Sequence, residues 1–207
     1  MYIDQLIERM PELGAMKAAI EEATGAILRM YADGGKVMLC GNGGSAADGE
    51  HIAGELLKGF LLKRTPLAEE IEAMGAELGS EAEATSLQRG VAAVPLSSLS
   101  GVFTAFCNDV DPSLVYAQLV YAMGMPQDVL ICLSTSGNSK NVVKAAQVAK
   151  ANGITTVALT GGTGGKLAEI CDIAIIAPSS ETYRVQEYHL PIYHAICAQV
   201  EHDLFAE

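Results

Sequence analysis

The sequence predicts an α/β fold: a three-layer sandwich in which a five-stranded parallel β-sheet is flanked by helices. Short apolar segments alternate with amphipathic segments of helical periodicity through most of the chain. Polar turns rich in glycine or hydroxyl groups follow three of the apolar segments. Strands that alternate with helices favour a parallel sheet covered on both faces, with ligands bound where the strands end.

Five segments are predicted to be strands, and each is short and apolar. They are residues 36–40, 91–97, 128–133, 154–159 and 173–178. Pro95 lacks a backbone N–H, so residues 91–97 are expected toward an edge of the sheet. Helices are expected from about Ser45, over 140–152 and 166–171, and from about Thr182 to the C-terminus.

The N-terminal part is predicted to be helical over residues 4–32, with a break near Pro11 and at most one more near Gly25. One domain is expected over 1–207, with 1–34 as its N-terminal helical segment. Residues 64–90 are acidic, rich in Ala and Glu, and carry no strand pattern. We expect a solvated insertion of helix and loop laid over the surface; the alternative is a lid or an oligomer contact.

Composition excludes several classes of protein. The 207 residues suffice for a sizeable core, and with 50% hydrophobic and 18% charged residues the chain is not disordered. The formal net charge of −12 argues against nucleic acid and anionic membranes as partners. It does not exclude a small anionic ligand, because backbone N–H groups and helix ends can make a site locally positive.

The expected location is the cytoplasm. No apolar run has the length of a membrane span, and the N-terminus lacks the pattern of a signal peptide. The five cysteines are odd in number and show no CxxC spacing. They are therefore predicted to be buried thiols of a reducing compartment and not a disulfide framework.

The turn "STSGNS" predicts an anion site. It places four hydroxyls at the start of a helix, whose first N–H groups also favour an anion. They belong to Ser134, Thr135, Ser136 and Ser139. Helix capping is the alternative, but it accounts for one hydroxyl or two. Neither glycine-rich turn fits a dinucleotide motif or a P-loop, so nucleotides are not favoured.

Two pairs of polar side chains are candidates for chemistry. His51 and Glu55 are four residues apart and share one helix face. Gln186 and His194 are eight apart, about 80° around the last predicted helix. Two such pairs could hold a divalent metal or transfer protons, and packed or solvated side chains are the alternative.

Four motifs together give a resemblance to a known family. They are "CGNGGSAADGEHIAGEL", "STSGNSKNV", "ALTGGTGGKL" and "YRVQEYHLPIYH". The chain resembles the sugar isomerase (SIS) fold, which is flavodoxin-like, and more narrowly the phosphoheptose isomerases. The resemblance implies conversion of sedoheptulose 7-phosphate to D-glycero-D-manno-heptose 7-phosphate through an enediol. It also implies a homotetramer with sites at subunit interfaces.

The resemblance also implies roles for individual residues. Glu55 matches the family's base and His194 its acid, while a zinc site would use His51, Glu55, Gln186 and His194. The substrate-binding positions that it implies are Asn42, Gly43, Gly44, Ser45, Asp109, Ser134, Thr135, Ser136, Ser139 and Gln186. Pro191 either only kinks the last helix or also aims His194.

Some positions depart from the family pattern. An Arg that often follows the His51–Glu55 helix is absent; Lys58 and Gly59 stand in that region. Tyr183 replaces an Asp that often precedes the "RVQE" segment. The alternatives are therefore a non-catalytic SIS protein that binds a phosphosugar and regulates a replication initiator, or an isomerase or etherase for another phosphosugar.

Overall fold

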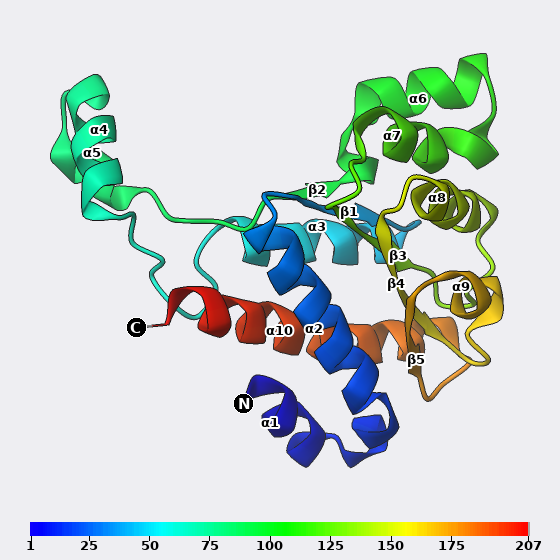
Figure 1. Cartoon of the computed structure of the whole chain (residues 1–207). Helices are drawn as coiled ribbons and strands as arrows, with labels where there is room; N and C mark the ends of the chain where they lie inside the picture. The colour runs from blue at the N-terminus through cyan, green and yellow to red at the C-terminus, as the bar shows by residue number, and fades with distance from the viewer. Residues whose placement is uncertain (207) are drawn as a thin grey trace.

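A parallel five-stranded sheet lies at the centre of the computed structural model, which describes residues 1–206 (Figure 1). The strand order is β2-β1-β3-β4-β5. The strands are β1 (Val37–Cys40), β2 (Ala93–Pro95), β3 (Val129–Leu133), β4 (Thr155–Gly161) and β5 (Ile173–Ala177). The predicted fold class is confirmed, and β2, which contains Pro95, is an edge strand as expected.

The order of the strands reverses between β1 and β3. From β1 the chain proceeds to β2 on one side, whereas β3, β4 and β5 follow on the other side. Residues 37–40 of β1 pair with 129–132 of β3, and Cys40 lies opposite Cys132. In sheets of this kind the turns after the two strands at the reversal diverge and leave a crevice for a ligand.

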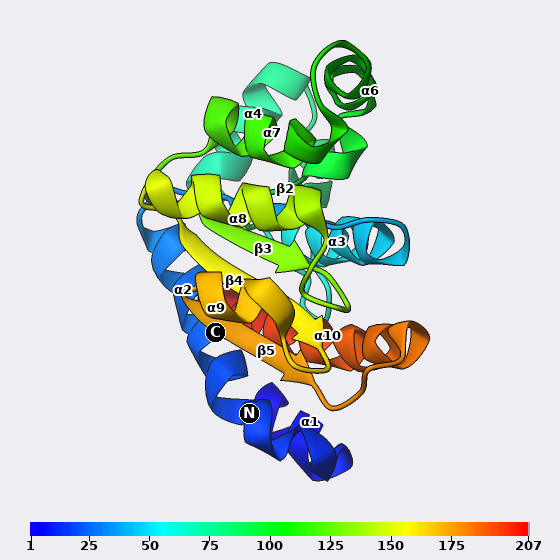
Figure 2. The same cartoon turned by 90° about the vertical axis from the view of Figure 1, so that its right-hand side faces the viewer.

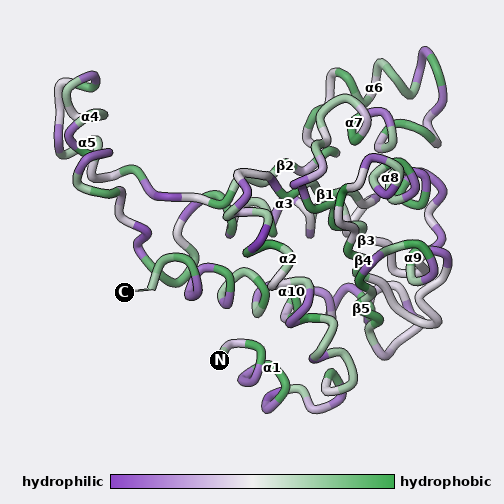
Figure 3. The backbone as a smooth tube through the Cα atoms, in the orientation of Figure 1, coloured by the Kyte–Doolittle hydropathy of each residue, from purple (hydrophilic) through white to green (hydrophobic). Residues whose placement is uncertain are grey.

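Two helical layers cover the sheet (Figure 2). One face buries an apolar cluster under α1 (Tyr2–Arg9), α2 (Lys17–Ala32), α3 (Gly44–Leu57) and α10 (Thr182–Phe205). The other face lies under α7 (Val115–Met123), α8 (Lys140–Ala151) and α9 (Gly165–Ile170), with α6 (Ser100–Asp109) packed outside α7. Figure 3 shows the strands as hydrophobic stretches between these layers, as expected of strands buried on both sides.

The N-terminal helix is interrupted at Pro11, as predicted. A short 3₁₀ segment, Pro11–Met16, separates α1 from α2. The second break that we considered, at Gly25, does not occur, because Gly25 lies within the continuous α2. The sequence analysis did not identify α6 and α7, which occupy the stretch between β2 and β3.

The acidic insertion is helical, but the expectation that it lies over the surface is wrong. It forms two helices, α4 (Ala68–Leu78) and α5 (Glu81–Ser86), which extend away from the sheet on two connecting segments (Figure 1). Of the residues in this α4–α5 arm, only Ala84 is buried. The two helices pack on each other, while Leu67, Leu78 and Leu87 at their ends are exposed.

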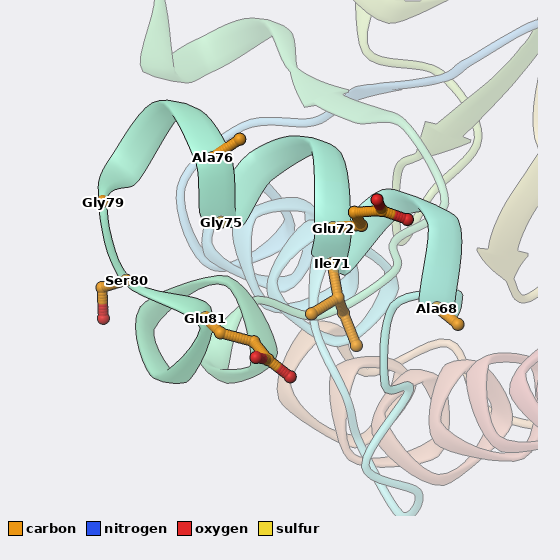
Figure 4. Close-up of a pocket in the computed structure, with 8 residues that line it drawn as sticks. All are labelled: Ala68, Ile71, Glu72, Gly75, Ala76, Gly79, Ser80 and Glu81. Carbon is orange, nitrogen blue, oxygen red and sulfur yellow. The ribbon is translucent and has the colours of Figure 1, made fainter.

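A pocket of about 510 Å³ lies between α4 and the start of α5 (Figure 4). Half of its eight lining residues are Ala or Gly, and Glu72 and Glu81 are the charged ones. Two carboxylates without a histidine or a basic partner offer no site for an anionic ligand. None of the residues that line this pocket is among the predicted functional residues.

The cysteines are free thiols, as predicted, but they are not all buried. Cys40, Cys132 and Cys197 are buried, whereas Cys107 and Cys171 are partly exposed. In residues 1–206 we find no helix with the length and apolar composition needed to span a bilayer. The division into one domain of 1–207 with an inserted segment stays a prediction, and its last residue lies outside the described range.

Gly137 gives the first testable prediction. Its φ is +65°, and a Cβ there would lie 1.9 Å from the Gly164 carbonyl oxygen. Gly137→Ala is expected to lower the free energy of unfolding by about 3 kcal/mol or more, from backbone strain and overlap together. Urea denaturation measures this loss.

Gly34→Ala is the matched control. Gly34 has a similar φ of +71°, but a Cβ would meet nothing within 4 Å. Gly34→Ala should lower the free energy of unfolding only by the backbone strain, about 1–2 kcal/mol. Equal losses in the two variants would show that the contact between the two turns does not matter.

Candidate active site

The hydroxyl-rich turn between β3 and α8 lies at the carboxyl end of the central strand of the sheet, and we call it the cradle. The Ser134 and Ser139 hydroxyls lie 3.0 Å apart. Ser139 is the N-cap residue of α8, yet its side chain makes no capping hydrogen bond. The capping alternative therefore does not account for this hydroxyl. Ser136 is exposed and Thr135 partly exposed, so both are available to a ligand.

The turn that follows β1 lies beside this cradle. The Asn42 and Asn141 side chains exchange two hydrogen bonds of 2.9 Å, which join the β1–α3 turn to the start of α8. Gly43 has a φ of +57°, and a Cβ on Gly44 would lie 2.6 Å from Gln186 Nε2. Gly44 thus lets the α10 amide approach the backbone. Ser45 is buried beneath the turn.

A cluster of titratable side chains lies further along α3. His51 Nε2 is 3.2 Å from Glu55 Oε1 and 3.4 Å from His194 Nε2. His51 and Glu55 come from α3, whereas His194 comes from α10, and the two helices pack together on one face of the sheet. The two predicted pairs therefore meet through three of their four members.

The surroundings of this cluster affect its protonation. Partial burial lowers the pKa of His194, and the nearby His51 lowers it further. The Phe60 ring lies 5.5 Å from the His194 ring. Lys58 Nζ lies 3.3 Å from Glu55 Oε2. The cluster thus contains a carboxylate and an imidazole whose uncharged form is favoured, which suits acid–base exchange.

A pocket of about 240 Å³ opens beside His194. It is bordered by α1, α10 and residues 60–61, and Arg9 and Gln5 are among its lining residues. The helix α10 continues through Pro191, which also lines this pocket. His194 is therefore accessible from outside the chain.

A buried ion pair holds α3 and α10 together behind the cluster. Arg64 Nε donates to Glu201 Oε1 at 2.7 Å, and both residues are buried. The Arg64 guanidinium also donates to the Leu56 and Glu55 carbonyls at 2.6 and 2.8 Å. Both carbonyls belong to the last turn of α3, where carbonyl groups have no hydrogen-bond partner within the helix. Arg64 therefore ties the C-terminus of α3 to α10.

Glu201 is held as a carboxylate by its neighbours. It accepts the backbone N–H groups of Phe60, Leu61 and Leu62 at 2.7–3.1 Å. Burial by itself would raise its pKa, but these N–H donors and Arg64 outweigh burial and lower the pKa. The charged pair is thus fully hydrogen-bonded, which a buried pair requires.

Two predicted residues lie apart from the cluster. Gln186 is beside Gly44, about 12 Å along α10 from His194 at 1.5 Å per residue. Asp109 ends α6, where it is exposed and accepts a hydrogen bond from Asn108. Among residues 1–206, moreover, no group of three or more His, Cys, Asp and Glu has the arrangement of a metal site. The four predicted zinc ligands of one chain therefore do not form a complete site.

Sequence reasoning missed the supporting residues. Arg64 and Glu201 carried no signal, because Arg64 begins the acidic stretch 64–90 and Glu201 lies within a predicted helix. Tyr193 was also missed, although its hydroxyl lies 2.9 Å from His51 Nδ1. A charged residue on the apolar face of a predicted helix is the sequence feature that could have pointed to Glu201.

The comparisons with known proteins bear on what this site does. Two SIS domain models match residues 1–98 and 102–201. A phosphoheptose isomerase of Rhodospirillum rubrum is 40% identical over 189 residues, which cover 91% of this chain and 88% of the relative. The chain belongs to the phosphoheptose isomerase family. A phosphoheptose isomerase of Aneurinibacillus thermoaerophilus is 39% identical over 90% of this chain and 82% of its own length.

Solved structures of the phosphoheptose isomerase family agree with this membership. The phosphoheptose isomerase GmhA of Neisseria gonorrhoeae superimposes with a TM-score of 0.75 at 31% identity, covering 96% of this chain and 94% of its own. A phosphoheptose isomerase from Francisella tularensis superimposes with a TM-score of 0.74 at 27% identity, and the match covers 97% of this chain and 94% of the other. As a member of this family the chain is a phosphosugar isomerase, and the resemblance seen in its motifs is confirmed.

The buried ion pair of Arg64 and Glu201 gives a second prediction. Glu201→Gln leaves the Arg64 charge buried without its counterion, which should cost about 3–5 kcal/mol of unfolding free energy. Because the pKa of Glu201 is lowered in the folded state, its charge stabilises the fold above the unfolded pKa near 4.5. That stabilisation is lost as the pH falls through the folded pKa.

Urea denaturation between neutral and acid pH tests both parts. Wild type should lose stability on acidification more steeply than Glu201→Gln. Glu187→Gln, on an exposed position of the same helix, serves as the control and should behave as wild type. Parallel pH profiles for wild type and Glu201→Gln would contradict the role given to this carboxylate.

Proposed function

We propose that the protein converts sedoheptulose 7-phosphate to D-glycero-D-manno-heptose 7-phosphate, with Glu55 as base and His194 as acid. The observation that carries the proposal is the meeting of Glu55, His51 and His194 from two helices in one cluster. The names of the relatives support the choice of heptose phosphate.

Interconversion of a ketose and an aldose needs one base and one acid. A base removes the proton from C1 of the ketose and forms an enediol, and it returns a proton to C2. An acid protonates the carbonyl oxygen and a proton leaves the neighbouring hydroxyl, so no atom is gained or lost. Glu55 suits the first role, and His194, whose pKa is lowered by burial, suits the second as an uncharged ring that can both donate and accept.

The cradle after β3 would hold the phosphate. Ser134, Thr135, Ser136 and Ser139 provide hydroxyls, and the N-terminus of the twelve-residue α8 provides N–H groups. Gly43, Gly44, Ser45 and Asn42 lie on the adjoining turn, where they would contact the sugar. Holding the phosphate fixes the reacting carbons relative to the base. Asp109 is proposed as a substrate contact on the family pattern alone.

Spacing along α3 supports a site shared between two chains. Glu55 lies about 16 Å along the helix axis from Gly44, at 1.5 Å per residue. An extended seven-carbon phosphate with bonds of about 1.5 Å spans roughly 10 Å. The distance along α3 thus exceeds the length of the substrate itself, which favours a site completed by a second chain. We infer an oligomer, a homotetramer by family resemblance, in which one chain's cradle faces another chain's cluster.

Zinc is part of the proposal only for the assembled protein. Imidazole and carboxylate donors suit zinc, but within the described chain His51, Glu55 and His194 do not have the arrangement of a metal site, so zinc would need further donors from an assembled protein. Gln186 lies too far along its own helix, so the fourth position would need the Gln186 of another chain. A bound zinc ion would supply a Lewis acid for the carbonyl oxygen. The roles of Glu55 and His194 do not depend on it.

The first test is turnover of sedoheptulose 7-phosphate by wild type and Glu55→Gln, with and without added zinc. Wild type should be active, and the variant should lose at least about 100-fold in kcat because the base is gone. Circular dichroism checks that the variant is folded. An inactive but folded wild type would favour another phosphosugar, or the alternative of a regulator that binds a phosphosugar without turning it over.

Mixing two inactive variants tests the shared site. Glu55→Gln removes the base, and Ser134→Ala with Ser136→Ala weakens the cradle. Co-refolded mixtures should recover part of the wild-type activity, since some sites would then combine an intact cradle with an intact Glu55. Separately refolded samples are the control. Recovery no greater than the control, in mixtures shown to contain both variants, would place the whole site within one chain.

A further inference from the structure

The α4–α5 arm carries an apolar stripe that its own chain covers only in part. The stripe begins at Leu67, the N-cap residue of α4. Ile71, Met74 and Leu78 follow at intervals of four, three and four residues, which puts all four side chains on one helix face, as in the seam of a coiled coil. Leu67 and Leu78 are 45% and 50% exposed, and the two residues between them are partly exposed. The stripe is therefore open to a partner.

The two flanks of this stripe differ. Gly75 lies on one flank, where a Cβ would be 3.3 Å from the Glu81 Cα of α5, so α5 packs along this side. Glu70 and Glu77 lie on the other flank, and both are exposed. Acidic residues beside an apolar seam let a helix select its partner by charge. The open flank thus favours a partner with positive charge.

The acidic character extends over the whole arm. Residues 66–88 contain six Glu and no Lys or Arg, and all six Glu are exposed. Within residues 1–206 none of the six takes part in an ion pair. The arm therefore has negative charge that its own chain does not neutralise.

A groove of opposite charge lies at the base of the arm. It has a volume of about 830 Å³ and is bordered by residues 62–68, by Arg89 and by the end of α10 (Figure 1). Its larger apolar side chains are Leu62, Leu67, Leu204 and Phe205. Lys63 and Arg89 also line it, and none of its described lining residues is acidic. The groove thus combines apolar contact with positive charge.

An arm cannot place its own tip in its own groove. The eleven-residue α4 runs from the base of the arm to its tip and is about 16 Å long at 1.5 Å per residue. Leu78, at the tip, is therefore held away from the Leu67 end, which lines the groove. A second copy of the chain supplies both an acidic tip for this groove and a groove for this tip.

We propose that two copies of the chain pair through their arms, with the α4 helices antiparallel and each Leu78 in the groove at the base of the other arm. A two-fold axis midway between Ile71 and Met74 makes the stripe self-complementary. Leu67 then faces the partner's Leu78, and Ile71 faces the partner's Met74. Glu77, beside Leu78, comes next to the basic side chains of the partner's groove. This contact does not depend on the proposed reaction.

Cross-linking of purified Leu67→Cys/Leu78→Cys tests the pairing. Under mild oxidation this variant should form a disulfide-linked dimer on a non-reducing gel. The two positions of one arm are about 16 Å apart, which is too far for a bridge within a chain. Leu78→Cys alone is the matched control and should cross-link far less, because it faces the partner's Leu67. Wild type controls for the five native thiols.

Charge reversal in the two-cysteine background tests the ionic part. Glu77→Lys should lower the initial cross-linking rate by about 5- to 30-fold, since an exposed ion pair is lost twice in a two-fold contact. Lys63→Glu should lower the rate as well, and the two changes together should restore it. Glu69→Lys, on the side of α4 opposite the stripe, is the control and should leave the rate unchanged.

Three results would overturn the proposal. One is absence of a cross-linked dimer in the two-cysteine variant, which would leave the stripe to a basic partner of another kind. Another is equal cross-linking in Leu78→Cys alone, and the third is a double charge reversal that does not restore the rate. The positions changed are exposed, so these variants should keep the fold, which circular dichroism checks. Because the readout is a bond between two arms, other contacts between chains do not obscure it.

Discussion

The arrangement of the candidate site depends on one buried ion pair. Arg64 lies just beyond α3 and Glu201 lies near the end of α10, and their bond joins the two helices that carry His51, Glu55 and His194. Desolvating both charges is costly, and the cost is offset only because each group is fully hydrogen-bonded. The same contact also closes the C-terminal end of α3 and fixes residues 60–62. The Arg64–Glu201 pair thus fixes the position of α3 against α10, the C-terminal end of α3 and the path of residues 60–62.

The sheet supplies the other half of the site and obeys a different constraint. Its cradle sits where the strand order reverses, so the turns after β1 and β3 are joined across the crevice by Asn42 and Asn141. Glycines allow the close approaches there, at Gly44 against α10 and at Gly137 against the next turn. The cradle is therefore positioned by backbone packing, whereas the acid–base cluster is positioned by side chains on two helices.

Sequence patterns were sufficient for the strands, because each is a short apolar run and three of the five are followed by a polar turn. They also led to the meeting of His51, Glu55 and His194, through spacing and family resemblance. They could not give the partners of these residues. Tyr193 in the sequence is one of several aromatic residues of an amphipathic helix, and its contact with His51 depends on the distance between α3 and α10. The direction of the α4–α5 arm was missed for a similar reason: its composition predicts exposed helices but not where they extend.

The pairing of β1 with β3 has a consequence for the order of folding. The paired Cys40 and Cys132 are separated by 92 residues, and α3 to α7 all lie between them. By contrast, β3, β4 and β5 are linked by single crossover helices and can pair after short loop closures. Long loops cost more entropy to close, and contacts distant in sequence slow folding. The β3–β5 half is thus expected to form first, and β1, with the helix α3 that follows it, is expected to join late. Pulse-labelled hydrogen exchange would then reveal a nucleus that contains the hydroxyl-rich turn after β3 but not the cluster of His51, Glu55 and His194.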